Sequence, residues 1–280
     1  MSSAYLLVSH GSGDPRPEVA MQQLAKLIGQ RQSAGRINLQ IPESKALVEV
    51  GDWAQTESNI SWRSTLKSSN AGLVVSQKEK PLVGTACLEL SAEPLHEQIR
   101  QFGDRALLSG CNRVQVIPLF LLPGMHVMED IPAEVAIAQQ ALEQVKIDLR
   151  PHLGTHPGLS HLLATSMAAI EADAWILLAH GSRRPGSKQT VEAIATQLGA
   201  ISAYWAVSPK LATQVKALVD TGYQQIGILP YFLFAGGITD AIASTVEQLK
   251  MQFPSVNLAL AEPIGASVEL ADLIWDLIEK

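Results

Sequence analysis

The chain has 280 residues, a formal net charge of −6 and an isoelectric point near 5.6. Because nucleic-acid phosphates attract basic surfaces, this acidic balance disfavours sequence-independent binding to nucleic acid. Apolar residues make up 47% and charged residues 17%, which excludes a disordered chain and is enough for two buried cores. The two cysteines, Cys87 and Cys111, have no CxxC spacing, so neither a disulfide framework nor a thiolate metal site is expected.

No charged segment precedes an apolar one at the N-terminus, as it would in a secretory signal. The longest apolar run, residues 116–125, is too short to span a bilayer. It is typical of a parallel strand buried on both faces. We therefore expect a soluble, cytoplasmic protein with no membrane partner.

Apolar strand-like segments alternate with helical segments along the chain. In the first half the pattern predicts strands at 4–8, 85–90, 114–121 and 146–150, and helices at 15–31, 94–109, 131–145 and 157–171. In the second half it predicts strands at 175–179, 203–207, 226–233 and 256–260, a helix beginning near Pro185, and helices at 209–222, 239–252 and 267–279. This order predicts βαβ units with helices on both faces of parallel sheets. The fold class is therefore α/β, with two similar doubly wound domains that each have a mainly four-stranded parallel sheet.

The two halves repeat one another. Residues 110–126 read GCNRVQVIPLFLLPGMH, and residues 222–238 read GYQQIGILPYFLFAGGI, at a constant offset of 112. A second pair of segments precedes them, LLVSHGS at 6–12 and ILLAHGS at 176–182. Repetition of this kind indicates a duplicated scaffold.

The repeat places a boundary near residue 172. It divides the chain into an N-terminal domain, 1–172, and a C-terminal domain, 173–280. The halves differ most at residues 32–84, where the first half has an excess of 53 residues. A peripheral insertion with one hairpin and a substrate lid are both compatible with this segment.

The second copy lacks side chains that the first copy carries. Glu89 is matched by Ala206. His126 is matched by Ile238, whereas the histidine of the first HGS turn is kept in the second. A duplicated scaffold that loses reactive side chains from one copy predicts one working site, in the N-terminal half, and one supporting half with a degenerate site.

His10, Glu89 and His126 follow three different strands, at the sheet edge where open α/β folds bind ligands. Two imidazoles and one carboxylate suit a borderline divalent ion such as Co²⁺, Fe²⁺, Ni²⁺ or Zn²⁺. Imidazole also titrates near neutral pH, so it can accept protons. We predict that these three residues are both metal ligands and catalytic groups. For His10, retention of His180 in the second copy leaves a structural role in the turn open.

Each HGS turn leads into a predicted helix, whose unpaired N–H groups and dipole suit an anion. The two serine hydroxyls are expected to cap these helices or to contact the anion. The second turn continues into a cluster of positive charge that includes Lys188, which suggests carboxylate or phosphate binding across the cleft between the domains. The predicted binding residues are Gly11, Ser12, Ser182, Arg183 and Arg184. The alternative is that the charges form a solvated surface.

The remaining histidines are weaker candidates. His152, His156 and His161 lie close together, as in a metal clip, but the segment passes through proline and glycine into a helix start. We therefore do not assign them a metal. His96 is expected on an exposed helix.

Three segments in order, LLVSHGSGDPR, CLEL with a following Pro94, and PLFLLPGMHVMEDIP, resemble the class II tetrapyrrole chelatases. Within that group the chain is similar to the long, two-half sirohydrochlorin cobaltochelatases and ferrochelatases, over nearly its whole length except 32–84. The resemblance implies an enzyme of the lyase class that inserts a divalent metal into sirohydrochlorin without ATP, on the route to sirohaem or cobalamin. The family's metal-binding histidines match His10 and His126, and its active-site glutamate matches Glu89.

The resemblance also implies that Co²⁺ or Fe²⁺ is a substrate and that no cofactor is tightly bound. Imidazole and carboxylate do not separate these two ions, so the physiological metal stays open. Shorter relatives pair two copies around the macrocycle, and the internal duplication would replace that pairing, which favours a monomer.

Three other classes of protein are alternatives. The first is a non-catalytic carrier of a tetrapyrrole or a metal. The second, a phosphohistidine phosphatase, is disfavoured because Ser9 and Ala179 stand where such enzymes place an arginine. The third, a periplasmic-type binding protein, is disfavoured by the lack of a signal sequence.

Overall fold

The computed structural model describes residues 3–31, 81–184 and 186–279. Of the predicted insertion at 32–84, residues 32–80 lie outside these ranges, and so does the choice between a hairpin and a lid. Among the described residues, no helix is both long and apolar enough to cross a membrane.

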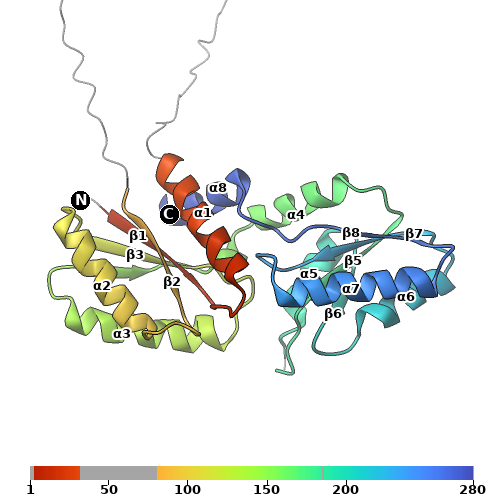
Figure 1. The fold of residues 1–280 in the computed structure, drawn as a ribbon, viewed down its shortest axis with the longest axis horizontal. Helices are drawn as coiled ribbons and strands as arrows, with labels where there is room; N and C mark the ends of the chain where they lie inside the picture. The colour runs from red at the N-terminus through yellow and green to blue at the C-terminus, as the bar shows by residue number, and fades with distance from the viewer. Residues whose placement is uncertain (1–2, 32–80, 185, 280) are drawn as a thin grey trace, which may run out of the picture.

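Two lobes lie side by side, and each is built on a four-stranded parallel sheet (Figure 1). The strand order is β2-β1-β3-β4 in the first lobe and β6-β5-β7-β8 in the second, so the opening strand of each half takes the same inner position. The strands are β1 (Ser3–Ser9), β2 (Val83–Cys87), β3 (Arg113–Pro118), β4 (Lys146–Leu149), β5 (Ala174–Ala179), β6 (Ile201–Tyr204), β7 (Gln225–Pro230) and β8 (Asn257–Leu260). The predicted α/β fold with two similar parallel sheets is confirmed.

Helices connect the strands as expected for βαβ units. They are α1 (Pro15–Arg31), α2 (Leu95–Leu108), α3 (Ile131–Ala141), α4 (Gly158–Ala168), α5 (Gln189–Gln197), α6 (Leu211–Asp220), α7 (Gly237–Gln252) and α8 (Val268–Glu279). A π-helical turn, η2 (His126–Asp130), precedes α3, and a 3₁₀ turn, η3 (Leu153–Thr155), precedes α4. The helix predicted to begin near Pro185 begins at Gln189. The prediction was wrong there because the chain first makes turns after the HGS segment.

In the first lobe, side chains alternate across the sheet. Ala4, Leu6 and Val8 of β1 face one core with α2 and α3. Tyr5 and Leu7 face the other core, with α1 and α8. This period of two is the one expected for a strand that is buried on both faces.

The last helix of each half packs on the sheet of the other half. Ile274 and Leu277 of α8 belong to the same buried cluster as Leu24 and Ile28 of α1. Leu163 of α4 is buried in the second lobe, with α5 and the strands of the second sheet. Figure 1 shows α8 beside α1, and α4 over the other lobe. The predicted domains, 1–172 and 173–280, follow the repeat in the sequence, and the packed lobes differ from them by this exchange of helices.

Candidate functional site

The first part of the site depends on a close approach between two backbone turns. β1 and β2 are parallel up to Ser9 and Cys87, and the pairing continues where Glu89 N donates to His10 O at 2.9 Å. Gly11 has a φ of +99°, and a Cβ at this position would lie 2.0 Å from Glu89 O. Only glycine combines that backbone conformation with that contact. The Gly11 turn therefore places His10 and Glu89 next to each other.

The end of β2 is held from the side by α2. The Gln98 side chain accepts from Cys87 N at 3.0 Å and donates to Cys87 O at 2.9 Å. Directly after Glu89, Leu90 has a φ of +58°, in the left-handed region that leucine rarely adopts. Such strained positions cluster at functional sites because the surrounding structure has to hold them in place.

The third residue reaches the site from a longer connection. β3 ends at Pro118, and the chain continues to the π-helical turn that begins at His126. Ile131 N donates to His126 O across this wider turn. Short π-helical turns occur frequently at functional sites. The Phe120 ring, from the same connection, lies 6.4 Å from the His10 ring and 6.2 Å from the His126 ring, between centroids.

These elements bring His10, Glu89 and His126 together. The two imidazole rings are 4.8 Å apart between centroids and nearly perpendicular, and His10 Nε2 lies 3.9 Å from Glu89 Oε2. One ligand atom from each residue lies within 4.8 Å of the other two. The side chains are 52%, 50% and 32% exposed, so an ion can reach them. Ligands bonded to one ion at about 2.1 Å lie about 3–4 Å apart, so small side-chain movements would complete a site.

In both histidines an oxygen atom next to Nδ1 determines which ring nitrogen carries the proton. His10 Nδ1 lies 3.3 Å from Gly11 O, and His126 Nδ1 lies 2.7 Å from Asp130 Oδ2. Carbonyl and carboxylate oxygens only accept, so Nδ1 donates in each case. Both Nε2 atoms are then unprotonated and could bind a metal ion.

A cavity of about 540 Å³ lies between the lobes. His10 and Ser12 line it from the first half. Phe232, Phe234 and Ile238, from the segment between β7 and α7, line it from the second half, together with the retained histidine of the second HGS turn. The wall from the second half is mainly apolar, and the volume of the cavity falls in the usual range of small-molecule sites.

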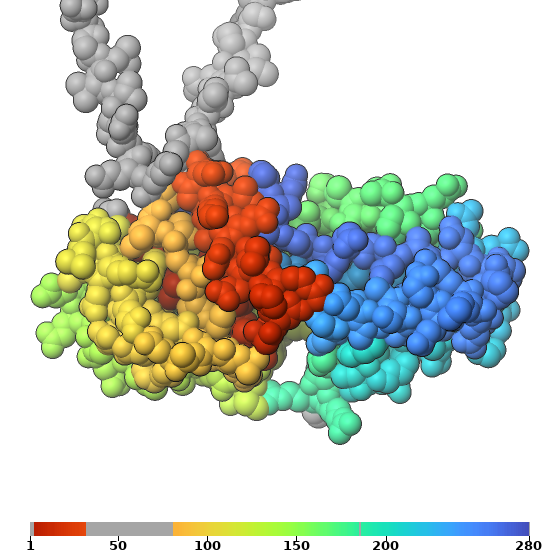
Figure 2. Space-filling model, in the orientation of Figure 1, coloured from red at the N-terminus to blue at the C-terminus, as the bar shows by residue number. Residues whose placement is uncertain are grey.

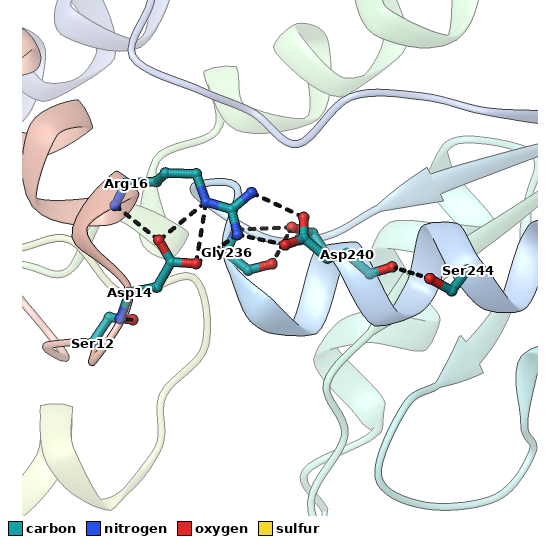
Figure 3. Close-up of polar contacts among 7 residues, drawn as sticks. Ser12, Asp14, Arg16, Gly236, Asp240 and Ser244 are labelled. Carbon is teal, nitrogen blue, oxygen red and sulfur yellow. Dashed lines mark hydrogen bonds and ion pairs between the residues drawn. The ribbon is translucent and has the colours of Figure 1, made fainter.

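An arginine joins the two lobes at the rim of this cavity. Arg16 at the start of α1 donates from Nε to Asp14 Oδ1 at 3.0 Å and from Nη1 to Asp240 Oδ1 of α7 at 2.9 Å (Figure 3). Figure 2 shows the start of α1 in red against the blue chain of the second lobe. The guanidinium lowers the pKa of Asp14 to about 2 and also lowers the pKa of Asp240. This ion pair was not predicted, because nothing in the sequence places the two segments side by side.

The predicted capping roles of the two serines are wrong. Ser12 Oγ accepts from Asp14 N at 3.0 Å, and Asp14 Oδ1 accepts from Arg16 N at 2.9 Å, so Asp14 caps α1. Ser182 lies well before α5, whose N-cap is Lys188. The helix therefore starts later than the HGS turn in both halves.

The predicted anion-binding residues form two groups. Gly11 and Ser12 line the cavity between the lobes. Ser182, Arg183 and Arg184 are exposed and line a second cavity of about 550 Å³ in the second lobe. The structure thus keeps each group together but gives the two groups separate cavities.

The other histidines are bonded to their surroundings. His152 Nδ1 lies 2.9 Å from Phe120 O, and His156 Nδ1 accepts from Gly158 N at 3.1 Å. His96 is half-buried, with Nδ1 2.9 Å from a carboxylate of α3, so its predicted exposure is wrong. Three or more histidine, cysteine or carboxylate side chains come close enough to share a metal ion at one place in the described part of the chain. That place is the trio of His10, Glu89 and His126.

Comparisons with known proteins show the family of the chain. Two copies of the CbiX family model match the chain, at residues 65–170 and 174–280. A sirohydrochlorin cobaltochelatase of Priestia megaterium is 26% identical over 71% of this chain and 69% of its own length. A sirohydrochlorin ferrochelatase of the same organism is 27% identical over 69% of this chain and 76% of its own length.

Solved structures show the same fold. SirB from Bacillus subtilis with Fe³⁺ superposes with a TM-score of 0.66, at 21% identity, over 100% of this chain and 95% of that one. The two matches to the family model meet near the predicted boundary and together cover most of the sequence. The chain belongs to the CbiX family.

Proposed function

We propose that this protein inserts Co²⁺ or Fe²⁺ into sirohydrochlorin, without ATP, in the biosynthesis of cobalamin or sirohaem. The observation that carries the proposal is the convergence of His10, Glu89 and His126, of which His10 lines the cavity between the lobes. The names of the two curated relatives, a cobaltochelatase and a ferrochelatase, support the same reaction. The metal and the macrocycle are both substrates, and no further cofactor is needed.

In this proposal the two Nε2 atoms hold the metal ion next to one face of the macrocycle. The ring nitrogens then replace imidazole and water as ligands of the ion. Glu89 offsets the positive charge and accepts one of the two protons that leave the central N–H groups, and an imidazole released from the metal accepts the other. Because the ion and the macrocycle are held face to face, positioning contributes a large part of the rate.

The macrocycle lies in the cavity between the lobes. Its apolar face packs against Phe232, Phe234 and Ile238 of the second half, which line the wall opposite His10. Its carboxylate side chains extend toward Gly11 and Ser12, which line this cavity, whereas Ser182, Arg183 and Arg184 line a separate one and stay a prediction as anion contacts.

The second half acts as a wall rather than as a second site. Ala206 and Ile238 stand where the first half has its glutamate and its second histidine, so the second half lacks two of the three ligands. One chain supplies both walls of the cavity, and we therefore propose that a cytoplasmic monomer is sufficient for activity.

An absorbance assay tests the reaction. Sirohydrochlorin is mixed with Co²⁺ or Fe²⁺ and a substoichiometric amount of protein, and the change in the macrocycle spectrum is followed over time. We expect many turnovers per chain above the uncatalysed rate. Binding of both substrates with no more than one metallation per chain would identify a carrier instead.

A further inference from the structure

One ring nitrogen of His126 is held by a side chain that plays no part in the proposed reaction. Asp130 Oδ2 lies 2.7 Å from His126 Nδ1, within the same π-helical turn. The two residues are four positions apart and both are partly exposed. The bond connects the first and last residues of η2, so the turn and the ring orientation support each other.

The bond has a definite chemical consequence. An ionised carboxylate only accepts hydrogen bonds, so the proton of a neutral His126 ring must be on Nδ1. The Nε2 atom is then unprotonated and directed away from Asp130. A histidine that binds a metal through one nitrogen commonly donates through the other to a carboxylate or a carbonyl, which fixes its tautomer and raises its basicity.

The second half lacks both the bond and the turn. At the offset of the repeat, His126 and Asp130 correspond to Ile238 and Ile242. Ile242 is fully buried in the core of the second lobe, and α7 runs as a regular α-helix from Gly237. Within the described ranges the π-helical turn thus occurs in the copy that carries the histidine and is absent from the other. The histidine, the aspartate and the turn differ between the copies as one unit.

We infer that Asp130 is a positioning residue that holds His126 in the Nδ1–H tautomer, with Nε2 ready to bind the metal. The inference rests on the proposed role of His126 as a metal ligand. It adds a residue that does not touch either substrate and acts through the imidazole. A merely structural Asp130 would stabilise η2 without changing the protonation of the ring.

The chain offers a matched control next to Asp130. Glu129 is exposed, belongs to the same turn and carries the same charge, but no contact joins it to His126. Asp130→Ala removes the hydrogen bond and one negative charge. Glu129→Ala removes one negative charge from the same turn, three positions from His126 instead of four. Asp130→Asn keeps an amide oxygen that can accept from Nδ1, and it tests whether the bond without the charge is enough.

Two measurements read the effect without sirohydrochlorin. Nitrogen-15 NMR of labelled histidine reports which ring nitrogen of His126 carries the proton. Titration with Co²⁺ alone, followed by the d–d absorption of the bound ion, reports the affinity of the site. We expect the wild type to show the Nδ1–H form. Asp130→Ala should move the ring toward the mixture of tautomers of a free histidine and weaken Co²⁺ binding about 10–100-fold.

Glu129→Ala should leave the tautomer unchanged and the Co²⁺ affinity within about twofold of the wild type. Asp130→Asn should retain the tautomer and part of the affinity. In turnover, Asp130→Ala should raise the KM for the metal and leave the KM for sirohydrochlorin unchanged. Circular dichroism and thermal unfolding show whether each variant is folded.

Three results would overturn the inference. A folded Asp130→Ala with the wild-type tautomer and affinity would do so, and so would equal weakening by Glu129→Ala. After either of these two results, the proposed function would still stand if His126→Ala had lost Co²⁺ binding. Unchanged Co²⁺ binding in His126→Ala would instead overturn the proposed metal site, and this inference with it.

Discussion

At the scale of single residues, the site depends on Gly11 as much as on its ligands. In the HGS turn after β1, Gly11 has a left-handed backbone conformation. It lies directly against the carbonyl oxygen of Glu89. A side chain at Gly11 would push the two turns apart, and His10 would then lose its position next to the carboxylate. The glycine therefore determines the distance between two of the three proposed ligands.

Substitution of Gly11 by alanine should weaken Co²⁺ binding and destabilise the first lobe. Left-handed backbone costs about 1–2 kcal/mol for a residue with a Cβ, and the contact with Glu89 O adds to that cost. Gly110 also has a positive φ, of +75°, but an added Cβ would meet open space. Gly110→Ala should therefore show the backbone cost alone. Gly13→Ala, which has neither feature, should be close to neutral. Urea unfolding and Co²⁺ titration of the three variants measure the two effects, and equal behaviour of Gly11→Ala and Gly110→Ala would show that the contact is unimportant.

Removal of the proposed ligand in the π-helical turn should stop the reaction while the fold is kept. We expect His126→Ala to lower the rate of metal insertion by on the order of 10²-fold or more, because ligand and proton-acceptor functions are lost together. His180→Ala removes a histidine that lines the cavity from the second half, and it should cost much less. The absorbance assay measures both rates. Near-wild-type insertion by purified His126→Ala would end the assignment of that residue.

Two of the three proposed ligands stand out in the sequence because the repeat marks them. Glu89 and His126 stand out by their replacement in the second copy, and the strand pattern places both at the same edge of the sheet. Asp130 was missed, although its spacing of four residues from His126 was visible. The pattern places both residues just before the predicted helix at 131–145, and a strand-and-helix pattern does not reveal a π-helical turn.

At the scale of whole elements, the exchange of terminal helices joins the lobes more strongly than a linker would. α8 supplies five buried residues to the first lobe, and Arg31 of α1 pairs with Asp272 on its surface. Arg150, after β4, donates to the last turn of α8 through Leu277 O at 3.0 Å. Neither lobe has a complete core without a helix from the other half.

A large-to-small substitution in α8 should therefore destabilise the first lobe, against which α8 packs. Ile274 is fully buried among β1, α1 and α8, so Ile274→Ala should cost about 2–5 kcal/mol. Hydrogen exchange should speed up in β1 and α1, although residue 274 belongs to the second half. Leu249→Ala in α7, which is buried against the second sheet, is the matched control and should affect exchange in that lobe first. The reverse pattern would contradict the exchange of helices.

The strands and helices could be predicted from the sequence because each sheet is covered on both faces. Its strands are therefore continuous apolar segments between helical ones. The exchange was not predictable in the same way. The apolar face of a helix such as α8 shows that it covers a sheet, but its period does not say which sheet. The predicted strand at 226–233 continues three residues beyond β7, because Tyr231, Phe232 and Leu233 remain apolar after the strand ends. Tyr231 and Phe232 pack in the second lobe, and Leu233 packs against the first.

At the scale of the whole molecule, Arg16 and Asp240 close the rim between the lobes. The pair joins the start of α1 to the first turn of α7, next to the residues that line the shared cavity. It is exposed, so its contribution is reduced by salt. Its position matters more than its strength, because it joins two segments whose neighbouring residues, Pro17 and Thr239, line the cavity.

The acid dependence of this contact has a definite sign. Arg16 lowers the pKa of Asp14 from 3.8 to about 2 in the folded protein and lowers that of Asp240. A carboxyl group whose pKa is lowered by folding contributes stability above its unfolded pKa and loses it as the pH falls through the folded pKa. The link between the lobes should therefore be complete above the unfolded pKa of these carboxyl groups, about 4, and weaken as the pH falls below it.

Arg16→Ala should remove this part of the acid dependence. Thermal unfolding of the wild type and the variant should differ most near neutral pH, and the difference should shrink toward pH 2. Arg100→Ala is the matched control, because Arg100 lowers the pKa of Glu97 to about 2 but pairs only within α2. A pair of fluorophores, one on each lobe, should report a wider and more variable separation in Arg16→Ala and an unchanged one in Arg100→Ala. If both variants leave the separation unchanged at neutral pH and low salt, the ion pair does not hold the lobes together, and the exchanged helices alone determine how far the cavity opens.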